Sequence, residues 1–409
     1  MLKRIAAITF IFLCTTVAWA VLGATIMART YSADAALRDR VHSSWGSPQV
    51  QRPPSATWSY TVPRATETTE DNRKVTRVIN ETISHSLPLE GSDVDVVLAL
   101  EHRQKGLLWY STYKVSFTGT YTFRNDSKES RVVTFRLPFP SAQALYDDFG
   151  LMLDNKPLEV TQLANGAESQ VTLVPDQIVQ LKARYNSQGV ESWRYEFGGD
   201  VAAVRNFHLH ATTNFKGVDF PDNTLSPTEK REIPAGWDLT WNYKNLLSGF
   251  QIGIVMPAKL QPGPLAGRIS FFAPVSLFFF FFLMFILTTL RNIELHPMNY
   301  FFLAAAFFSF HLLLAYLVDH ISIHAAFAIS SLVAIFLVVS YLRLVVGIRF
   351  AAVEAALAQF LYLVLFSYAF FFEGFTGLAV TIGSILTLFV VMQMTGRVRW
   401  SEKFVSARS

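Results

Sequence analysis

The sequence ISFFAPVSLFFFFFLMFILTTL occupies residues 269–290 and contains no charged side chain. A transmembrane helix needs about 20 mostly apolar residues to cross the hydrocarbon core of a bilayer. This stretch therefore predicts a membrane-spanning helix, with Pro274 near one end as its only helix-breaking residue. Further apolar stretches of sufficient length follow at residues 300–318, 323–346, 350–372 and 374–395. The C-terminal part of the chain is thus expected to cross a membrane five times.

Residues 5–27 form another long apolar stretch, preceded by Lys3 and Arg4. The apolar core of a cleaved signal peptide runs about 7–15 residues, whereas this stretch exceeds twenty. Its length favours a retained anchor, while the small residues around Ala20 to Ala24 leave cleavage open as the alternative. We therefore expect six transmembrane helices, one N-terminal and five C-terminal.

The positive charges predict the orientation of these helices, because short cytoplasmic loops retain Lys and Arg. With the N-terminus inside, seven cations fall on the cytoplasmic side: Arg291, Arg343, Arg349, Arg397, Arg399, Lys403 and Arg408. The two outer turns, around Asp319 and Glu373, contain no Lys or Arg. The expected organisation is an anchor at 1–27, an extracytoplasmic domain at 28–268, a five-helix domain at 269–395 and a cytoplasmic tail at 396–409.

Composition excludes several classes of protein. Of the 409 residues, 51% are hydrophobic and only 16% are charged, which is too apolar for an ordinary soluble enzyme. Residues 28–268 carry 26 Lys and Arg against 26 Asp and Glu, so a basic nucleic-acid-binding face has no support. The single cysteine, Cys14, excludes a disulfide framework and a cysteine-rich metal site.

The segment between the first two spans shows the period of two that is typical of half-buried strands. Tyr113, Val115 and Phe117 alternate with Lys114 and Ser116, and similar alternation recurs near residues 133–137, 179–185, 207–211 and 239–243. This pattern predicts a β-rich domain, and an antiparallel sandwich is the favoured arrangement. We expect a short helix at 32–43, an irregular polar stretch at 44–64 and connectors at 220–236 and 258–268.

Histidines on one strand are the first candidate site. His208 and His210 lie two residues apart, so their side chains point the same way and could share a metal ion. No acidic residue or third ligand is close in sequence. A polar strand face is therefore the favoured interpretation, and we expect neither a metal nor another cofactor.

Polar residues at the predicted outer turn form a second candidate. Asp319, His320 and His324 would lie at the ends of two helices, and Glu373 would return to the same side. A metal or proton site is conceivable there. Polar residues are also the normal composition of helix ends in the head-group region, which is the favoured interpretation.

Two ionisable residues inside predicted spans are the third candidate, because a charge in hydrocarbon is costly. His311 lies near the middle of its helix, whereas Glu354 lies about one turn from the cytoplasmic end and can reach water or Arg349. We expect His311 to be neutral and bonded to Ser or Tyr of a neighbouring helix. Transporters usually carry more midplane polar groups and broken helices, so transport is the alternative function.

The sequence contains no phosphate-binding Gly-Lys-Ser/Thr loop, no Gly-x-Ser-x-Gly elbow and no His-Glu-x-x-His helix. We therefore expect a protein that is not an enzyme.

Several motifs in the C-terminal part resemble the CreD family of bacterial inner-membrane proteins. The loop motif His-Pro-x-x-Tyr is matched by His296, Pro297 and Tyr300, and the acidic-His helix end by Asp319 and His320. Tyr341 to Arg343 and Arg397 to Trp400 also fit, although Arg399 replaces the usual Asp and Asp319 the usual Glu. The resemblance covers about 140 C-terminal residues, and in the outer domain it extends only to a general β character.

The resemblance implies a multi-pass protein of the bacterial inner membrane that is linked to cell-envelope integrity, colicin tolerance and the response to cell-wall stress. Both termini would be cytoplasmic, and residues 28–268 would be periplasmic and would bind or scaffold. The expected partners are the lipid bilayer, envelope lipids and other membrane proteins, with no nucleic acid. The alternative is a transporter or flippase for a lipid-linked or amphipathic solute. From the residues alone, anchoring and helix packing explain His296, Pro297 and Tyr300.

Overall fold

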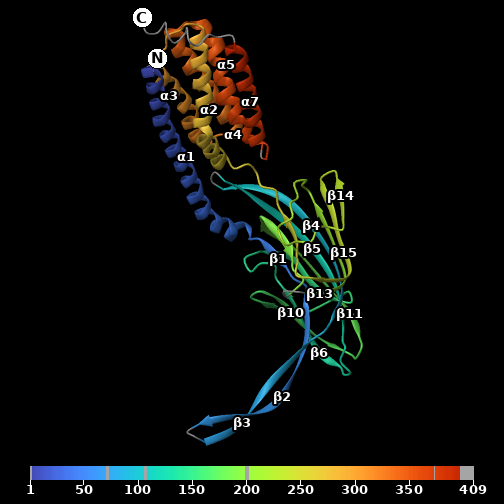
Figure 1. Cartoon of the computed structure of the whole chain (residues 1–409). Helices are drawn as coiled ribbons and strands as arrows, with labels where there is room; N and C mark the ends of the chain where they lie inside the picture. Colours follow the sequence, from blue (N-terminus) through green and yellow to red (C-terminus); the bar gives the residue numbers. More distant parts are fainter. Residues whose placement is uncertain (1, 71–72, 106–107, 199–201, 373, 397–409) are drawn as a thin grey trace. The chain divides into compact units, whose positions relative to one another are not determined.

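The computed structural model describes residues 2–70, 73–105, 108–198, 202–372 and 374–396. The chain forms two compact units. The helical unit comprises Met1–Ala36, Gly106–Leu108 and Leu260–Ser409, and the β unit comprises Leu37–Lys105 and Trp109–Lys259. Figure 1 shows the helices of the first unit and the sheets of the second.

Among the described residues, six helical segments are long and apolar enough to cross a membrane, which confirms the predicted number. The α-helices that contain five of them are α1 (Leu2–Trp45), α2 (Pro262–Leu290), α3 (Pro297–Leu317), α4 (Ile323–Val345) and α7 (Thr376–Thr395). The remaining span is Phe350–Phe371. The helix expected at 32–43 is a continuation of α1, because nothing in the sequence there breaks the helical hydrogen-bond ladder.

The span Phe350–Phe371 is not a regular α-helix, although an intact helix is expected from the sequence. Its elements are a π-helical segment at Phe350–Ala355, α5 (Ala356–Gln359), a second π-helical segment at Phe360–Leu365, α6 (Phe366–Tyr368) and a 3-10 turn at Ala369–Phe371. A π-helical segment shifts backbone hydrogen bonds from their α-helical partners. The carbonyl of Tyr362 there accepts a hydrogen bond from the hydroxyl of Ser276 on α2.

Aromatic side chains fill the core of the helical unit. Trp19, Phe280, Tyr300 and Phe307 are fully buried. The Trp19 ring meets Phe307 edge to face, with ring centroids 6.4 Å apart. Because apolar residues gain little by leaving lipid for a protein interior, this close packing, rather than the hydrophobic effect, holds the helices together.

The β unit contains sixteen strands in the described residues. They are β1 (Gln49–Gln51), β2 (Ser55–Glu70), β3 (Arg73–Ser86), β4 (Leu89–Lys105), β5 (Leu108–Arg124), β6 (Arg131–Pro138), β7 (Tyr146–Leu153), β8 (Lys156–Pro157), β9 (Thr161–Leu163), β10 (Gly166–Leu173), β11 (Ile178–Val190), β12 (Ser192–Tyr195), β13 (Ala202–Thr213), β14 (Glu229–Ile233), β15 (Gly236–Ser248) and β16 (Ile252–Val255).

These strands form an eight-stranded sheet of order β14-β15-β13-β4-β5-β11-β7-β8, a five-stranded sheet of order β3-β2-β6-β10-β9 and a three-stranded sheet of order β1-β12-β16. Most neighbours are antiparallel, as expected. Two pairs, β13 with β4 and β1 with β12, are parallel, which the sequence pattern did not indicate.

The sheets share one core because alternate residues of each strand face inward. Phe123 of β5 packs edge to face on Phe135 of β6 at 5.7 Å, which joins the eight-stranded sheet to the five-stranded one. Tyr185 of β11 donates a hydrogen bond of 2.6 Å to the side chain of Gln51 on β1, which joins the three-stranded sheet. Burial of each such aromatic side chain contributes roughly 2 kcal/mol.

Two expectations about irregular segments are wrong. The stretch 44–64 contains the end of α1, β1 and the first half of β2, and the connector 220–236 contains β14. Figure 1 shows β2 and β3 as a long hairpin that extends beyond the rest of their sheet. From Ser59 to Arg64 every β2 residue is exposed. Residues 55–62 nevertheless read SATWSYTV and alternate polar with apolar residues, a strand signal that the sequence analysis missed.

Candidate functional site

Aspartate and histidine side chains pair across β4 and β13. Nδ1 of His208 lies 2.8 Å from Oδ1 of Asp93, and Nδ1 of His210 lies 3.1 Å from Oδ1 of Asp95. The parallel register places these residues directly opposite each other, although they are 115 positions apart in the chain. No acidic residue is close in sequence, as noted above, and the acidic partners of the histidines come from a distant strand.

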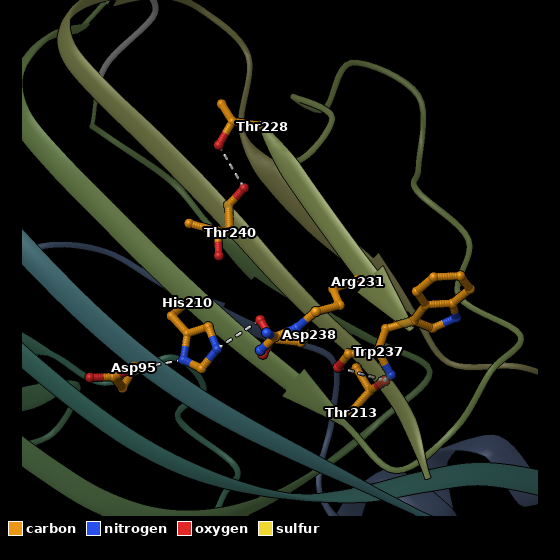
Figure 2. Close-up of polar contacts among 8 residues, drawn as sticks. All are labelled: Asp95, His210, Thr213, Thr228, Arg231, Trp237, Asp238 and Thr240. Carbon is orange, nitrogen blue, oxygen red and sulfur yellow. Dashed lines mark hydrogen bonds and ion pairs between the residues drawn. The ribbon is translucent and has the colours of Figure 1, made fainter. Parts of the chain in front are cut away.

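The row continues across β15 and β14, as Figure 2 shows. Nε2 of His210 lies 3.0 Å from Oδ1 of Asp238, and Arg231 donates a hydrogen bond of 2.7 Å to Oδ2 of the same carboxylate. The Arg231 hydrogen bond, followed by that from His210, lowers the pKa of Asp238. Both ring nitrogens of His210 thus lie within hydrogen-bond distance of carboxylate oxygens.

The His–Asp row is a chain of charge-assisted hydrogen bonds on a sheet surface. Among the described residues, no group of three or more His, Cys, Asp or Glu side chains is arranged to hold a metal ion. The row can fix the register of β4, β13, β15 and β14, because each contact joins neighbouring strands.

A second surface of the β unit, which the sequence analysis missed, carries a stack of rings on β2 and β3. The ring of His85 lies nearly parallel to those of Trp58 and Tyr60, with centroids 4.7 and 5.7 Å away. The guanidinium of Arg131 covers Trp58 at 4.3 Å. Tyr60 is 38% exposed and His85 is exposed. The spacing Trp-x-Tyr indicates two aromatic side chains on one face of a strand. The third ring, that of His85, could not be predicted because it comes from the partner strand.

At one end of the helical unit, the residues of the predicted outer turn have different partners. A carboxylate oxygen of Asp319 lies 3.1 Å from Nη2 of Arg29 on α1. His320 is exposed, and the ring of His324 packs on Phe371 at 5.2 Å. Glu373 lies outside the described residues. The contacts therefore connect Asp319 to α1, and they do not join the histidines to it.

At the opposite helix ends, His296 and Pro297 begin α3. Nδ1 of His296 accepts a hydrogen bond of 3.2 Å from the backbone of Met298, and Pro297 occupies the first helical position. Tyr300 follows one turn later and is fully buried, with no hydrogen-bond partner for its hydroxyl.

Glu354 forms an ion pair with Arg291, the residue that ends α2. The expected contact was with Arg349 or water. Packing of the fifth span against α2 explains the difference, since it brings a cation from another helix to the carboxylate. The second carboxylate oxygen, Oε2, is buried and has no partner.

His311 is buried in the helical unit, but not in the expected way. Its Nδ1 lies 3.1 Å from the carbonyl oxygen of Phe307 one turn earlier in α3, instead of a Ser or Tyr of another helix. Its Nε2 has no partner, and its ring meets that of Trp19 edge to face at 5.7 Å. The own-helix carbonyl is the nearer acceptor because the side chain points back along α3.

Further buried polar groups in the same unit lack partners. They are Nε1 of Trp19, the hydroxyl of Ser330 and both amide atoms of Gln359. All three residues have 0% exposure. An unpaired polar group in a low-dielectric interior costs about 1–3 kcal/mol. The sequence analysis missed them, although an isolated Gln359 in an apolar run was a usable signal.

The order of elements, with one apolar helix before a β unit and five spans after it, agrees with the family resemblance. The family profile described as inner membrane protein CreD matches residues 1–195 and 220–401. The chain belongs to the CreD family. The predicted resemblance is confirmed, and the CreD match extends through most of the β unit. No curated protein matches the chain.

Solved structures resemble this CreD-family chain only weakly. A candidate nutrient-binding protein from Legionella pneumophila has a TM-score of 0.29 and 11% identity, over 48% of this chain and 74% of that one. A mutant M1 zinc metallopeptidase from Deinococcus radiodurans has a TM-score of 0.27 and 14% identity, over 42% of each chain. Likeness at this level carries no argument about the function of the CreD-family chain.

Proposed function

We propose that this CreD-family protein maintains cell-envelope integrity or serves the envelope-stress response, without being an enzyme, by binding envelope components through its β unit outside the inner membrane. The ring stack of Trp58, Tyr60 and His85 carries the proposal. Parallel rings present flat apolar faces with polar edges, a surface type that is enriched where proteins bind partners. Tyr60 and His85 reach the surface, where a partner can contact their rings.

The placement of the stack supports a binding role. It lies on the β2–β3 hairpin, where β3 pairs only with β2 in the five-stranded sheet and is its edge strand. An edge strand offers unpaired backbone donors and acceptors beside the rings. The guanidinium of Arg131 on β6, which pairs with Glu129 at 2.8 Å, lies 4.3 Å from the centre of the Trp58 ring and extends the flat surface. Flat rings beside backbone hydrogen-bonding groups suit an amphipathic envelope component.

The test is Trp58→Ala in cells that lack the chromosomal copy. We expect greater sensitivity to detergent than in cells with the unchanged protein, at equal amounts of protein in the membrane. The matched control is Phe250→Ala, which removes an aromatic ring of 51% exposure elsewhere on the β unit. Equal sensitivity of Trp58→Ala and unchanged cells would contradict the proposed role of the stack.

Transport of a lipid-linked or amphipathic solute is the second candidate, and the unpartnered polar groups of the helical unit favour it. Polar groups inside spans mark solute and proton pathways. Trp19, His311, Ser330 and Gln359 each leave a polar atom without a partner. The irregular helix that carries Gln359 adds the backbone distortion that transporters show near binding sites.

Two adjacent serines on α4 test this second candidate. The hydroxyl of Ser330 has no partner, whereas that of Ser331 donates a hydrogen bond of 2.8 Å to the carbonyl of Phe327 in its own helix. A polar pathway predicts that His311→Ala and Ser330→Ala abolish the envelope phenotype without lowering the amount of membrane protein, while Ser331→Ala does not. Unchanged behaviour of His311→Ala would exclude a pathway through this residue.

A further inference from the structure

An apolar groove runs along the helical unit between α1 and α2. Its volume is about 460 Å³, and its walls include Ile5 and Leu13 of α1 and Phe278 and Phe282 of α2. Thr9 is the single hydroxyl residue of the lining. From Ile5 to Leu13 the helix rises about 12 Å, which is most of the roughly 15 Å hydrocarbon depth of one leaflet. Leu13 is 57% exposed and Phe278 is 53% exposed, so the groove opens to the surface.

Unsatisfied hydrogen-bond donors lie at the end of this groove where α1 begins. The guanidinium of Arg4 lies over Phe285, a lining residue, at 5.8 Å and over Tyr300 at 6.0 Å. Nε and Nη2 of Arg4 are enclosed and have no acceptor, and the hydroxyl of the fully buried Tyr300 has no partner either. The Tyr300 ring meets Phe281, another lining residue, at 5.3 Å.

Arg29, another arginine of α1, has the hydrogen-bond acceptors that Arg4 lacks among the described residues. Nη2 of Arg29 lies 3.1 Å from Asp319 and 3.1 Å from the carbonyl oxygen of Ala315. In the part of the chain that the structure describes, Arg4 has no such carboxylate. An arginine stays charged in proteins and binds a phosphate through two parallel hydrogen bonds. Among the described residues, no anion therefore lies at this end of the groove.

We propose that the groove between α1 and α2 binds one acyl chain of an anionic glycerophospholipid, whose phosphate accepts hydrogen bonds from Arg4. The ligand comes from the leaflet that surrounds the beginning of α1. Arg4 is only partly buried, so its side chain can turn toward a head group at the surface. The apolar walls hold the chain, and the uncompensated positive charge selects a lipid of net negative charge.

Native mass spectrometry of the full chain in mild detergent tests this site with phosphatidylglycerol and phosphatidylethanolamine. We expect phosphatidylglycerol to bind at least about tenfold more tightly, and Arg4→Gln to remove that preference. The matched control is Arg29→Gln, which removes a cation from the other end of the same span and should keep the preference. Equal binding of both lipids to the unchanged protein, or an unchanged preference in Arg4→Gln, would overturn the proposal.

Two further experiments distinguish binding of the acyl chain from binding of the head-group phosphate. Glycerol phosphate supplies the phosphate without an acyl chain, and it should not displace the bound lipid. Thr9→Trp places a large side chain in the groove while Arg4 remains, and it should weaken lipid binding. Displacement by glycerol phosphate, or full lipid binding by Thr9→Trp, would show that the groove does not hold the chain. These outcomes are independent of the function proposed for the β unit, because no residue of that unit takes part.

Discussion

Nε2 of His210 on β13 lies 3.0 Å from a carboxylate oxygen of Asp238 on β15. Nδ1 of the same ring lies 3.1 Å from Asp95 on β4, so one imidazole connects three neighbouring strands. Arg231 on β14 donates a hydrogen bond to the other carboxylate oxygen of Asp238. This row joins four strands of the eight-stranded sheet, and its hydrogen bonds depend on the charge state of each member.

The row predicts a loss of stability in acid. Asp238 has a lowered pKa, mainly because of its hydrogen bond from Arg231, whereas in the unfolded chain it takes its ordinary value of 3.8. A lowered folded-state pKa stabilises the fold above the unfolded value, and this contribution is lost as the pH falls through the folded value. Circular dichroism melts of the full chain should show a midpoint that falls below about pH 4.

Asp238→Asn is the variant that isolates this effect. Its unfolding midpoint should be lower than that of the unchanged protein at pH 7, with a smaller further fall below pH 4, because the amide does not titrate. His210, Asp95 and Arg231 are present in both proteins. Parallel curves for the two proteins across this range would contradict a role for Asp238 in acid stability.

Buried tyrosines predict a second loss of stability in alkali. Tyr113, Tyr121, Tyr185 and Tyr195 are fully buried in the β unit, and burial raises the pKa of each above the ordinary value of 10.0. A raised folded-state pKa gives stability below the unfolded value that is lost as the pH rises above it. Each such tyrosine should therefore remove about 1.4 kcal/mol of stability per pH unit above pH 10.

Tyr121→Phe tests this directly, because it removes one hydroxyl from the core. Its stability should fall less steeply between pH 10 and 11, as measured by denaturant unfolding of the full chain. Phe117→Leu, which alters the same buried core without removing an ionisable group, is the control and should leave the slope unchanged. An identical slope for Tyr121→Phe would show that the core tyrosines ionise without unfolding.

The turn between β14 and β15 requires glycine at position 236. A Cβ atom there would lie 2.2 Å from the carbonyl oxygen of Thr213 and 2.7 Å from the backbone nitrogen of Phe215, and neither backbone atom can move away cheaply. Figure 2 shows Thr213 bonded to Trp237 beside this turn. Gly236→Ala should lower the free energy of unfolding by about 1–3 kcal/mol.

Gly91→Ala is the matched control for this prediction. Its added Cβ atom would lie 3.5 Å from the nearest neighbour, the carbonyl oxygen of Asn206, which is an ordinary contact. We expect its unfolding free energy to stay within about 0.5 kcal/mol of the unchanged protein. Equal stability of the two alanine variants in denaturant would contradict the close approach at Gly236.

The charge distribution predicts the orientation in the membrane. Reporters that are active only in the cytoplasm should work after Arg291 and after Ser409, and fail after Pro257. The physical reason is the retention of Lys and Arg in short cytoplasmic loops. Activity after Pro257 together with silence after Arg291 would reverse the topology and remove the extracytoplasmic role from the proposed function.

The six spans could be predicted from the sequence because crossing a bilayer is a local requirement. Each segment must satisfy its own backbone hydrogen bonds and match the hydrocarbon thickness, so its length and apolarity suffice. Alternation likewise revealed β5 and β11, whose one face is buried. Residues 55–62 of β2 alternate in the same way, but there the pattern does not mark a buried face, because Ser59 to Arg64 are exposed on both sides of the strand.

Only the tertiary structure decided which polar groups meet. Asp93 and His208 are paired by a parallel register across 115 residues, Arg29 meets Asp319 across 290 residues, and Glu354 meets Arg291 rather than Arg349. Spacing along the chain encodes the face on which a side chain lies, but not the strand or helix that lies opposite it. The sequence by itself thus determined where this protein spans the membrane, whereas packing determined its polar contacts. Among the described residues, packing also left Nε and Nη2 of Arg4 and the Tyr300 hydroxyl without a hydrogen-bond partner.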